Sequence, residues 1–494
     1  MMLMSHLPAL VIIIPLVCAP LCVLLRGKDW AFGVAVLATW ASFVCSILLT
    51  LQVSELGTIS YAMGGWEPPY GIELRIDALN AYILLIVSGI GSVVVPYARN
   101  SMLLEYIESR AYLFYSAYLL CLCGLMGVAV TGDAFNLFVF LEISSLSSYV
   151  LIALGSDRRA LTAAYQYLVM GTIGATFIVI AVGLLYQATG TLNMADIAKR
   201  LPEAGYGNRT VIAAFAFLAI GAGLKIAIFP LHQWLPNAYT YAPNVVSAFL
   251  AATATKVSVY ILLRFVFSVF GVDFSFNSLP SAIPFLALAV IAMFIPSIVA
   301  CFQMNVKRVL AYSSVGQIGY MMLGVSLVSV AGLTASILHL FNHALMKGAL
   351  FLVLGAVFYR IGSCRIDRMA GLAKQMPWTM AAFVGGGLSL VGVPLTAGFI
   401  SKWYLILAAL EKGWWYIAVL IVVTSLIAVI YVWRVFEAAY FRDPPADLCN
   451  VAEAPLSLLL PAWILVLANF YFGLETSISV GLAERAAQAL MGGG

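Results

Sequence analysis

Long apolar stretches separated by short polar breaks run along the whole chain. Each stretch has about the 20 residues that a helix needs to cross the hydrocarbon core of a bilayer, and the alternating pattern of barrel strands is absent. The pattern therefore predicts an all-α polytopic membrane protein. The fourteen predicted transmembrane helices cover residues 8–26, 30–53, 78–97, 111–131, 133–155, 162–187, 210–231, 244–270, 279–303, 308–328, 332–359, 379–410, 414–440 and 455–474.

The composition supports this class. Only 9% of the 494 residues are charged and 63% are hydrophobic, whereas about 25% of a soluble chain is charged. Soluble, disordered and collagen-like proteins are therefore excluded. The net charge of +4 is small and lies mostly in loops, so we expect a lipid bilayer and no nucleic acid as the partner.

The distribution of Lys and Arg predicts the orientation. Loops after odd-numbered helices carry thirteen of these residues, Lys307 and Arg308 among them, and loops after even-numbered helices carry five. Positive loops stay in the cytoplasm, so we expect both termini on the external or periplasmic side of the cell (inner) membrane. Residues 1–20 lack a basic region and a cleavage site, and are expected to form a retained first helix.

Five charges lie inside the predicted helices. Each costs about 2.5–3.5 kcal/mol near the bilayer centre. A single one is often an internal ion pair or snorkels to an interface, but one carboxylate cannot neutralise four amines. Burial favours the neutral amine, so such lysines can exchange protons. We expect Glu142 to pair with a protonated Lys225, which releases its proton when the pair breaks; the other three are Lys256, Lys347 and Lys402.

The predicted eleventh helix carries a stripe of titratable residues. His339 and His343 are four residues apart, and Lys347 continues the same face. Two histidines at this spacing can bind a metal, but no carboxylate is near and the lysine opposes a cation. No metal is expected. The stripe is either a polar face satisfied by serines and waters or a proton relay, which we favour.

Two predicted helices contain proline breaks, at Pro230 in the seventh and Pro394 in the twelfth. Proline removes a helical hydrogen bond, and one such break can be an ordinary kink. Two breaks five helices apart, each near a lysine, indicate internal repeats with ion sites at their centres. His232 beside the first break is a candidate for lining a water path, and residues 193–201 are expected to form a short amphipathic helix.

No cofactor is expected. The eight cysteines form no CxxC motif and lie mostly in apolar stretches, which argues against iron–sulfur and zinc sites. Nucleotide-binding and nucleophile motifs are absent from the sequence. We therefore expect an ion-translocating subunit rather than an enzyme, and any oxidoreductase activity would belong to a whole redox complex.

Four motifs resemble the proton-conducting antiporter family, which includes the antiporter-like subunits of respiratory complex I, the Mrp-type cation/proton antiporters and membrane-bound hydrogenases. The resemblance spans residues 76–440 and rests on LKIAIFPLHQWLPNA (224–238), KRVLAYSSVGQIGY (307–320), HALMKG (343–348) and GFISK (398–402). It implies fourteen helices with two inverted five-helix repeats containing broken helices. The implied domains are 1–110 (helices 1–3), 111–270 (first repeat), 279–441 (second repeat) and 455–494 (last helix and tail).

The resemblance also implies roles for the buried residues. Glu142 and Lys225 match the family's glutamate–lysine pair, and Lys256 matches the linking lysine. The central relay corresponds to His339, His343 and Lys347, and the terminal lysine to Lys402.

The residues around the first break help to choose within the family. Length and the LPNAY pattern (235–239) look most like the D subunit of the Mrp-type antiporters. Lys402 is lysine where the middle complex I subunit has glutamate, and the chain ends about twenty residues after the last helix, without a long lateral helix. Tyr239 stands where complex I relatives commonly have histidine, and at this position the chain departs from the family's relay pattern.

We therefore predict a proton-translocating membrane subunit of a multi-subunit monovalent cation (Na⁺/K⁺)/proton antiporter. The alternative is a proton-pumping antiporter-like subunit of a complex I-type NADH:quinone oxidoreductase or a membrane-bound hydrogenase. Either implies other membrane subunits of a hetero-oligomeric complex as partners. Lysines suit protons better than a bare cation, which prefers oxygen ligands.

Overall fold

The computed structural model describes residues 2–105, 110–205, 207–448 and 450–492. The chain begins with α1 (Met2–Ser5), α2 (Leu7–Leu25) and α3 (Lys28–Leu56), followed by an antiparallel hairpin of β1 (Ile59–Ala62) and β2 (Glu73–Ile76) with Ile59 opposite Ile76. Helices α4 (Ala78–Glu105), α5 (Ala111–Val130), α6 (Ala134–Ala153), α7 (Arg159–Thr189), α8 (Met194–Ala204), α9 (Arg209–Ile226), α10 (Trp234–Tyr241) and α11 (Asn244–Leu263) follow.

The second half continues with α12 (Ala282–Cys301), α13 (Val306–Ser326), α14 (Val330–Ile361), α15 (Leu372–Gln375), α16 (Pro377–Val391), α17 (Ala397–Glu411), α18 (Trp415–Phe441), α19 (Leu456–Leu474) and α20 (Ser477–Leu490). Short helical turns cover Met63–Gly65, Arg264–Val269, Asp273–Ser278, Asp367–Met369 and Ala446–Leu448.

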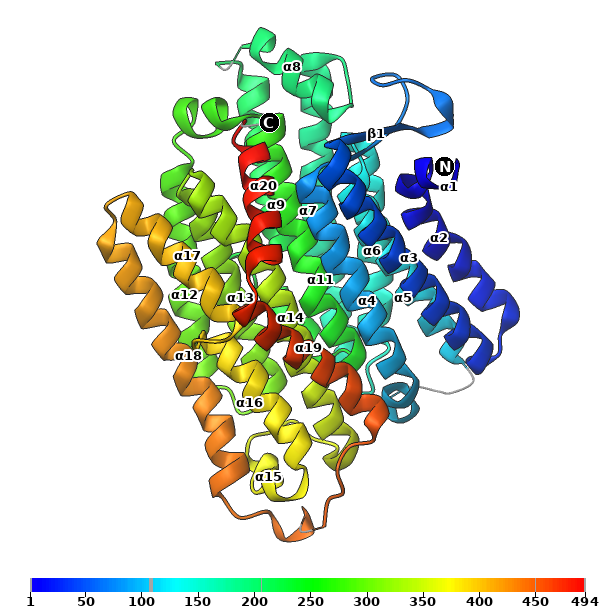
Figure 1. The fold of residues 1–494 in the computed structure, drawn as a ribbon, viewed down its shortest axis with the longest axis vertical. Coiled ribbons are helices and arrows are strands. Elements are labelled where there is room, and N and C mark those ends of the chain that lie inside the picture. The colour runs from blue at the N-terminus through cyan, green and yellow to red at the C-terminus, as the bar shows by residue number, and fades with distance from the viewer. Residues whose placement is uncertain (1, 106–109, 206, 449, 493–494) are drawn as a thin grey trace.

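The long helices run up and down, and both chain ends lie at the same end of the bundle (Figure 1). This end, which also carries β1 and α8, is called the terminus face below. The short helix α15 lies at the opposite end (Figure 1).

Twelve helices of the described residues are long and apolar enough to cross a membrane. The two other predicted spans differ for physical reasons. One is α13, whose sequence is less apolar, and the other is divided into α16 and α17, of 15 residues each. The all-α membrane fold is confirmed, whereas the count of fourteen crossings stays a prediction.

Helices α4, α5, α11 and α14 are the most enclosed of the membrane-length helices. Within their apolar spans 94% of the residues of α11 and 78% of those of α4, α5 and α14 are buried inside the bundle, compared with 33% for the peripheral α3, α12 and α18. Because α11 and α14 contact protein rather than lipid along most of their length, polar side chains on them find protein partners.

The short helix expected at residues 193–201 is present as α8 (Met194–Ala204). Asn193 accepts a hydrogen bond from the Asp196 N–H (3.0 Å) and begins the helix. The β1–β2 hairpin and α20 were not predicted. Helix α20 packs the small residues Ala483, Ala486 and Ala487 against the bundle, and their spacing of three to four residues fits one helix face.

Candidate functional site

The first proline break separates α9 from α10 and ends α9 one residue after Lys225. Ala227 has a left-handed backbone (φ 62°), and Pro230 lies in the unwound segment. The Trp234 indole N–H donates to the Leu224 carbonyl oxygen (3.0 Å). This bond satisfies a carbonyl that the end of the helix leaves free, so the break is a stable part of the fold.

Lys225 reaches from this break to α6. Its amine lies 3.5 Å from Glu142 Oε1 and donates to the Ser145 hydroxyl (2.7 Å). The Lys225 side chain is 2% exposed and that of Glu142 is 24% exposed. The contact is therefore an ion pair held in place by a neutral hydroxyl, with its carboxylate at the edge of the protein interior.

Lys256 lies midway along α11 and is fully buried. Its amine donates to the Ala251 carbonyl oxygen and, more distantly, to the Thr255 hydroxyl (3.4 Å). No acidic group lies within ion-pair distance of it among the residues that the structure describes. A lysine with only neutral acceptors can be charged or neutral without breaking an ion pair.

The histidine stripe of α14 contacts two other helices. His339 Nε2 lies 2.9 Å from the Gln317 amide oxygen on α13, and Nδ1 lies 2.8 Å from the Ser401 hydroxyl on α17. Because an amide oxygen only accepts, Nε2 carries the proton and Nδ1 accepts in this arrangement. His343 stacks below it with ring centroids 6.2 Å apart, and neither of its buried nitrogens has a hydrogen-bond partner among the described residues.

Lys347 continues the stripe by one turn and is fully buried. Its amine donates to the Leu310 carbonyl oxygen (2.8 Å) and to the Ser313 hydroxyl (2.5 Å), both on α13. Like Lys256, it has neutral acceptors only.

The second break separates α16 from α17 near Lys402. Gly392 and Leu395 have left-handed backbones (φ 89° and 74°), with Pro394 between them. The Lys402 amine donates to the Val391 and Leu390 carbonyl oxygens (2.8 and 3.2 Å) and lies 5.0 Å from the Tyr320 ring centroid. The carbonyls freed by the end of α16 thus hold the lysine, as expected for a cation at a helix C-terminus.

The structure places the seven predicted site residues on α6, α9, α11, α14 and α17; six of them are buried inside the bundle, and Glu142 is partly exposed. Only Lys225 and Glu142 form an ion pair with each other. The remaining titratable groups contact carbonyl, hydroxyl or amide oxygens, so transfer between them needs side-chain movement or intervening water.

Two further positions near the first break were noted in the sequence. His232 is partly buried, its Nδ1 has no hydrogen-bond partner in the described part of the chain, and its ring stacks on Phe229. The Tyr239 hydroxyl donates to the Leu250 carbonyl oxygen (3.2 Å).

Within the described residues, no group of three or more His, Cys, Asp or Glu is placed to hold a metal ion.

Sequence reasoning missed three charged residues, one of them alone and two in a pair. Lys307 was assigned to a cytoplasmic loop, but it lies in the first turn of α13, is 6% exposed and donates to the Ala242 carbonyl oxygen (2.7 Å). Arg264 and Asp77 form a buried ion pair (2.8 Å) between the end of α11 and the start of α4. The sequence feature that could have placed Lys307 inside the helix is Asn305. Its side chain accepts a hydrogen bond from the Lys307 N–H, so the helix begins earlier than predicted.

These features define a polytopic helical membrane protein with broken helices and ionisable groups inside its bundle, and such groups mark ion pathways in membrane proteins. The chain belongs to the NADH:quinone oxidoreductase/Mrp antiporter family, whose transmembrane model matches residues 131–428. The predicted family resemblance is confirmed.

Two curated relatives cover nearly the whole chain. The N subunit of the NADH-quinone oxidoreductase of Desulforudis audaxviator is 40% identical over 95% of this chain and 96% of its own. The D subunit of the Na⁺/H⁺ antiporter of Bacillus subtilis is 32% identical over 99% of this chain and 98% of its own.

Solved structures agree with the fold. A chain of the Mrp complex from Dietzia sp. matches with a TM-score of 0.91 at 25% identity, covering 99% of this chain and 98% of its own. A chain of the archaeal membrane-bound sulfane sulfur reductase matches with a TM-score of 0.90 at 30% identity, covering 98% of both chains.

Proposed function

We propose that this chain is the proton-translocating membrane subunit of a multi-subunit monovalent cation (Na⁺ or K⁺)/proton antiporter. The observation that carries the proposal is the set of buried lysines, of which one is ion-paired and three are held by neutral oxygens. Relatives named as the D subunit of a Na⁺/H⁺ antiporter support this function. The matching Mrp structure is a complex, which supports other membrane subunits as partners.

In the proposed mechanism Glu142 holds the proton-carrying Lys225 as an ammonium. When the pair separates, the ammonium gives its proton to water or to the next amine and becomes neutral. Lys256, Lys347, His343 and His339 then accept and donate the proton in turn, and Lys402 is the terminal lysine of this row, beside His339 and its partner Ser401. Each transfer leaves the donor neutral and the acceptor charged, so no net charge accumulates along the path.

The two breaks support the inverted repeats, residues 111–270 and 279–441, with residues 1–110 and 455–494 outside them. Each break frees carbonyls beside a lysine, Lys225 at the first and Lys402 at the second. We further propose that the terminus face lies outside the cytoplasm, because the Lys- and Arg-rich loops connect the helices at the opposite end.

The second candidate is a proton-pumping subunit of a redox complex. The NADH-quinone oxidoreductase relative and the sulfane sulfur reductase structure favour it. Purification of the native complex separates the candidates: tightly bound flavin or iron identifies a redox complex, whereas sodium-driven proton movement by a complex without them supports the antiporter.

The proton path is tested in proteoliposomes that contain the whole complex and a pH-sensitive dye. Lys225→Ala is expected to abolish proton translocation while the complex still assembles. Lys374→Ala, at a lysine of the short peripheral helix α15, is the matched control and is expected to behave like the wild type. Wild-type translocation by an assembled Lys225→Ala complex would overturn the proposal.

A further inference from the structure

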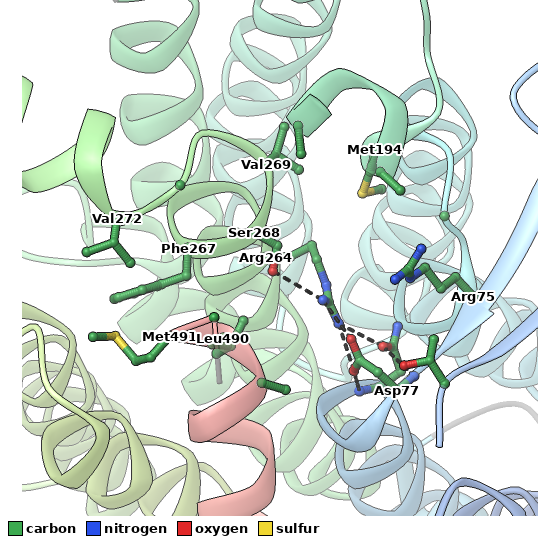
Figure 2. Close-up of a pocket in the computed structure, with 18 of the residues that line it drawn as sticks. Arg75, Asp77, Met194, Arg264, Phe267, Ser268, Val269, Val272, Leu490 and Met491 are labelled. Atoms are coloured by element: carbon green, nitrogen blue, oxygen red, sulfur yellow. Dashed lines mark hydrogen bonds and ion pairs between the residues drawn. The ribbon is translucent and has the colours of Figure 1, made fainter. Parts of the chain in front are cut away.

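A cavity of about 710 Å³ opens on the terminus face and is not part of the site described above (Figure 2). Its walls come from the end of β2, from α8, from the end of α11 and from the last residues of α20. At about 30 Å³ per molecule, this volume holds on the order of twenty waters. The cavity is therefore large enough to be an aqueous vestibule.

An ion pair forms the floor of this vestibule, where Figure 2 shows Asp77 and Arg264 joined by dashed lines. The Arg264 guanidinium forms a bidentate ion pair with the Asp77 carboxylate (2.8 and 3.0 Å). The Arg264 side chain is 12% exposed and that of Asp77 is 14% exposed. Burial alone raises the pKa of Asp77, but the charge of Arg264 and hydrogen bonds bring it below its usual 3.8. The pair is therefore ionised at neutral pH.

A second polar layer lies directly beneath the pair. The Asn80 amide oxygen accepts from Arg264 (2.7 Å), and its NH₂ group donates to the Tyr260 hydroxyl (2.9 Å) and to the Ala129 carbonyl oxygen. The Arg264 guanidinium also lies 5.5 Å from the Tyr260 ring centroid. The two layers form a plug in which each charged group has a partner.

The plug is continuous with the proton path through α11. Lys256, Tyr260 and Arg264 follow one another at intervals of four residues and so share one helix face. The Lys256 amine now points away from the plug, toward the Ala251 carbonyl oxygen. Proton release toward the cavity therefore requires a change of the Lys256 side-chain rotamer that turns the amine toward Tyr260.

We propose that the cavity is an outlet that branches from the relay at Lys256, through which protons leave toward the terminus face, and that the Asp77–Arg264 pair is its gate. This inference rests on the proposed function. With the gate open, the Lys256 ammonium gives its proton to water in the cavity and remains as a neutral amine, and the hydronium leaves. With the pair intact, the Arg264 and Asp77 side chains occupy the floor of the cavity and close the path.

The charge at the mouth of the cavity favours release over capture. Among the described residues that line it, Arg75 and Lys199 form no ion pair, and Asp273, which accepts a hydrogen bond from the Asn277 amide (2.9 Å), is the one carboxylate without a cationic partner. This excess of positive charge disfavours a bound metal cation. This charge fits the proposed role as a proton outlet better than a sodium site.

The gate is tested by labelling a cysteine beneath it in the assembled complex. Tyr260→Cys is made with and without Asp77→Asn, and a membrane-impermeant thiol reagent is added on the terminus face. Asparagine keeps the oxygen that accepts from the Leu79 and Asn80 N–H groups at the start of α4 but loses the charge. We expect labelling about tenfold faster or more with Asp77→Asn, and equal rates would overturn the gate.

A matched control removes an exposed ion pair instead. Asp367→Asn, whose partner Arg365 is more than half exposed, is expected to leave labelling unchanged. Arg264→Lys keeps the charge but cannot make the bidentate contact, and is expected to accelerate labelling as Asp77→Asn does. Agreement of the two gate variants excludes a folding defect peculiar to one of them.

The outlet is tested by the passive proton leak of proteoliposomes. Asp77→Asn is expected to raise the leak on the order of tenfold over wild type, which corresponds to about 1.4 kcal/mol of barrier. Faster labelling without a leak, in a complex that translocates protons, would overturn the outlet. Faster labelling in a complex whose wild type moves no protons would refute the proposed function and leave the gate supported.

Discussion

The ion pair between Glu142 and Lys225 allows a quantitative prediction. Two unit charges 3.5 Å apart attract each other by about 5 kcal/mol at an effective dielectric constant of about 20. Glu142→Gln removes this attraction and leaves the fully enclosed amine with the Ser145 hydroxyl. Removing one partner of a buried pair costs about 3–5 kcal/mol, and a lysine avoids this cost by losing its proton.

The population of protonated Lys225 then decreases. Since each 1.4 kcal/mol is a factor of about ten, a loss of about 3 kcal/mol lowers this population about a hundredfold. We expect Glu142→Gln to slow proton translocation by a similar factor. Glu142→Asp keeps the charge at a greater distance and is expected to fall between Glu142→Gln and the wild type.

The assay is the initial rate of proton movement into proteoliposomes, at equal amounts of assembled complex. Thermal unfolding of each variant is measured in parallel, because a neutral lysine leaves the fold intact. Wild-type rates for Glu142→Gln would refute the reasoning. So would a Glu142→Asp variant as slow as Glu142→Gln, because charge would then not be the determining property.

Three other predictions follow from particular contacts. Gly392→Ala places a Cβ 3.0 Å from Lys402 Cδ at a φ of 89°, and a left-handed backbone costs about 1–2 kcal/mol for L-residues. We therefore expect lower thermal stability and slower proton translocation. An unchanged melting temperature would contradict this prediction. Trp234→Phe removes the donor to the Leu224 carbonyl and is expected to lower the free energy of unfolding by about 1–3 kcal/mol, measured by denaturant titration. Asp77 has a lowered pKa, so its stabilising charge is present above its usual 3.8 and is lost only as the pH falls through the folded value. Because thiol labelling itself slows as the thiolate is protonated, the measured quantity is the ratio of the Tyr260→Cys labelling rates with and without Asp77→Asn. This ratio is expected to stay constant from about pH 9 to about pH 5, and a ratio that falls towards one in this range would contradict it.

The fold class was predictable because apolar stretches of membrane length are long-range features of the sequence. The helix breaks were also predictable, since Pro230 and Pro394 each lie in an unwound segment. The β1–β2 hairpin and α20 were not, because their elements are short and their burial depends on neighbours distant in sequence. Helix α20 has an alanine-rich buried face, which carries little hydrophobic signal.

The partners of the site residues were less predictable. The Asp77–Arg264 pair joins residues 187 positions apart at the ends of two predicted helices, where charges normally face solvent. His339 and Ser401 meet across 62 positions, and only the packing of α14 against α17 brings them together. The sequence alone identified which single residues are ionisable and lie inside helices. The contacts that these residues make between helices required the three-dimensional structure.

The hydrogen-bond partners of the buried lysines share a property that bears on synthesis. Lys225 binds α6, Lys347 binds α13 and Lys402 binds the end of α16, while Lys256 binds the preceding turn of its own helix. Every one of these partners precedes its lysine in the chain. Because a protein is made from its N-terminus, each amine enters the membrane after the oxygens that receive it, and the nascent chain can shelter each charge as soon as it is inserted.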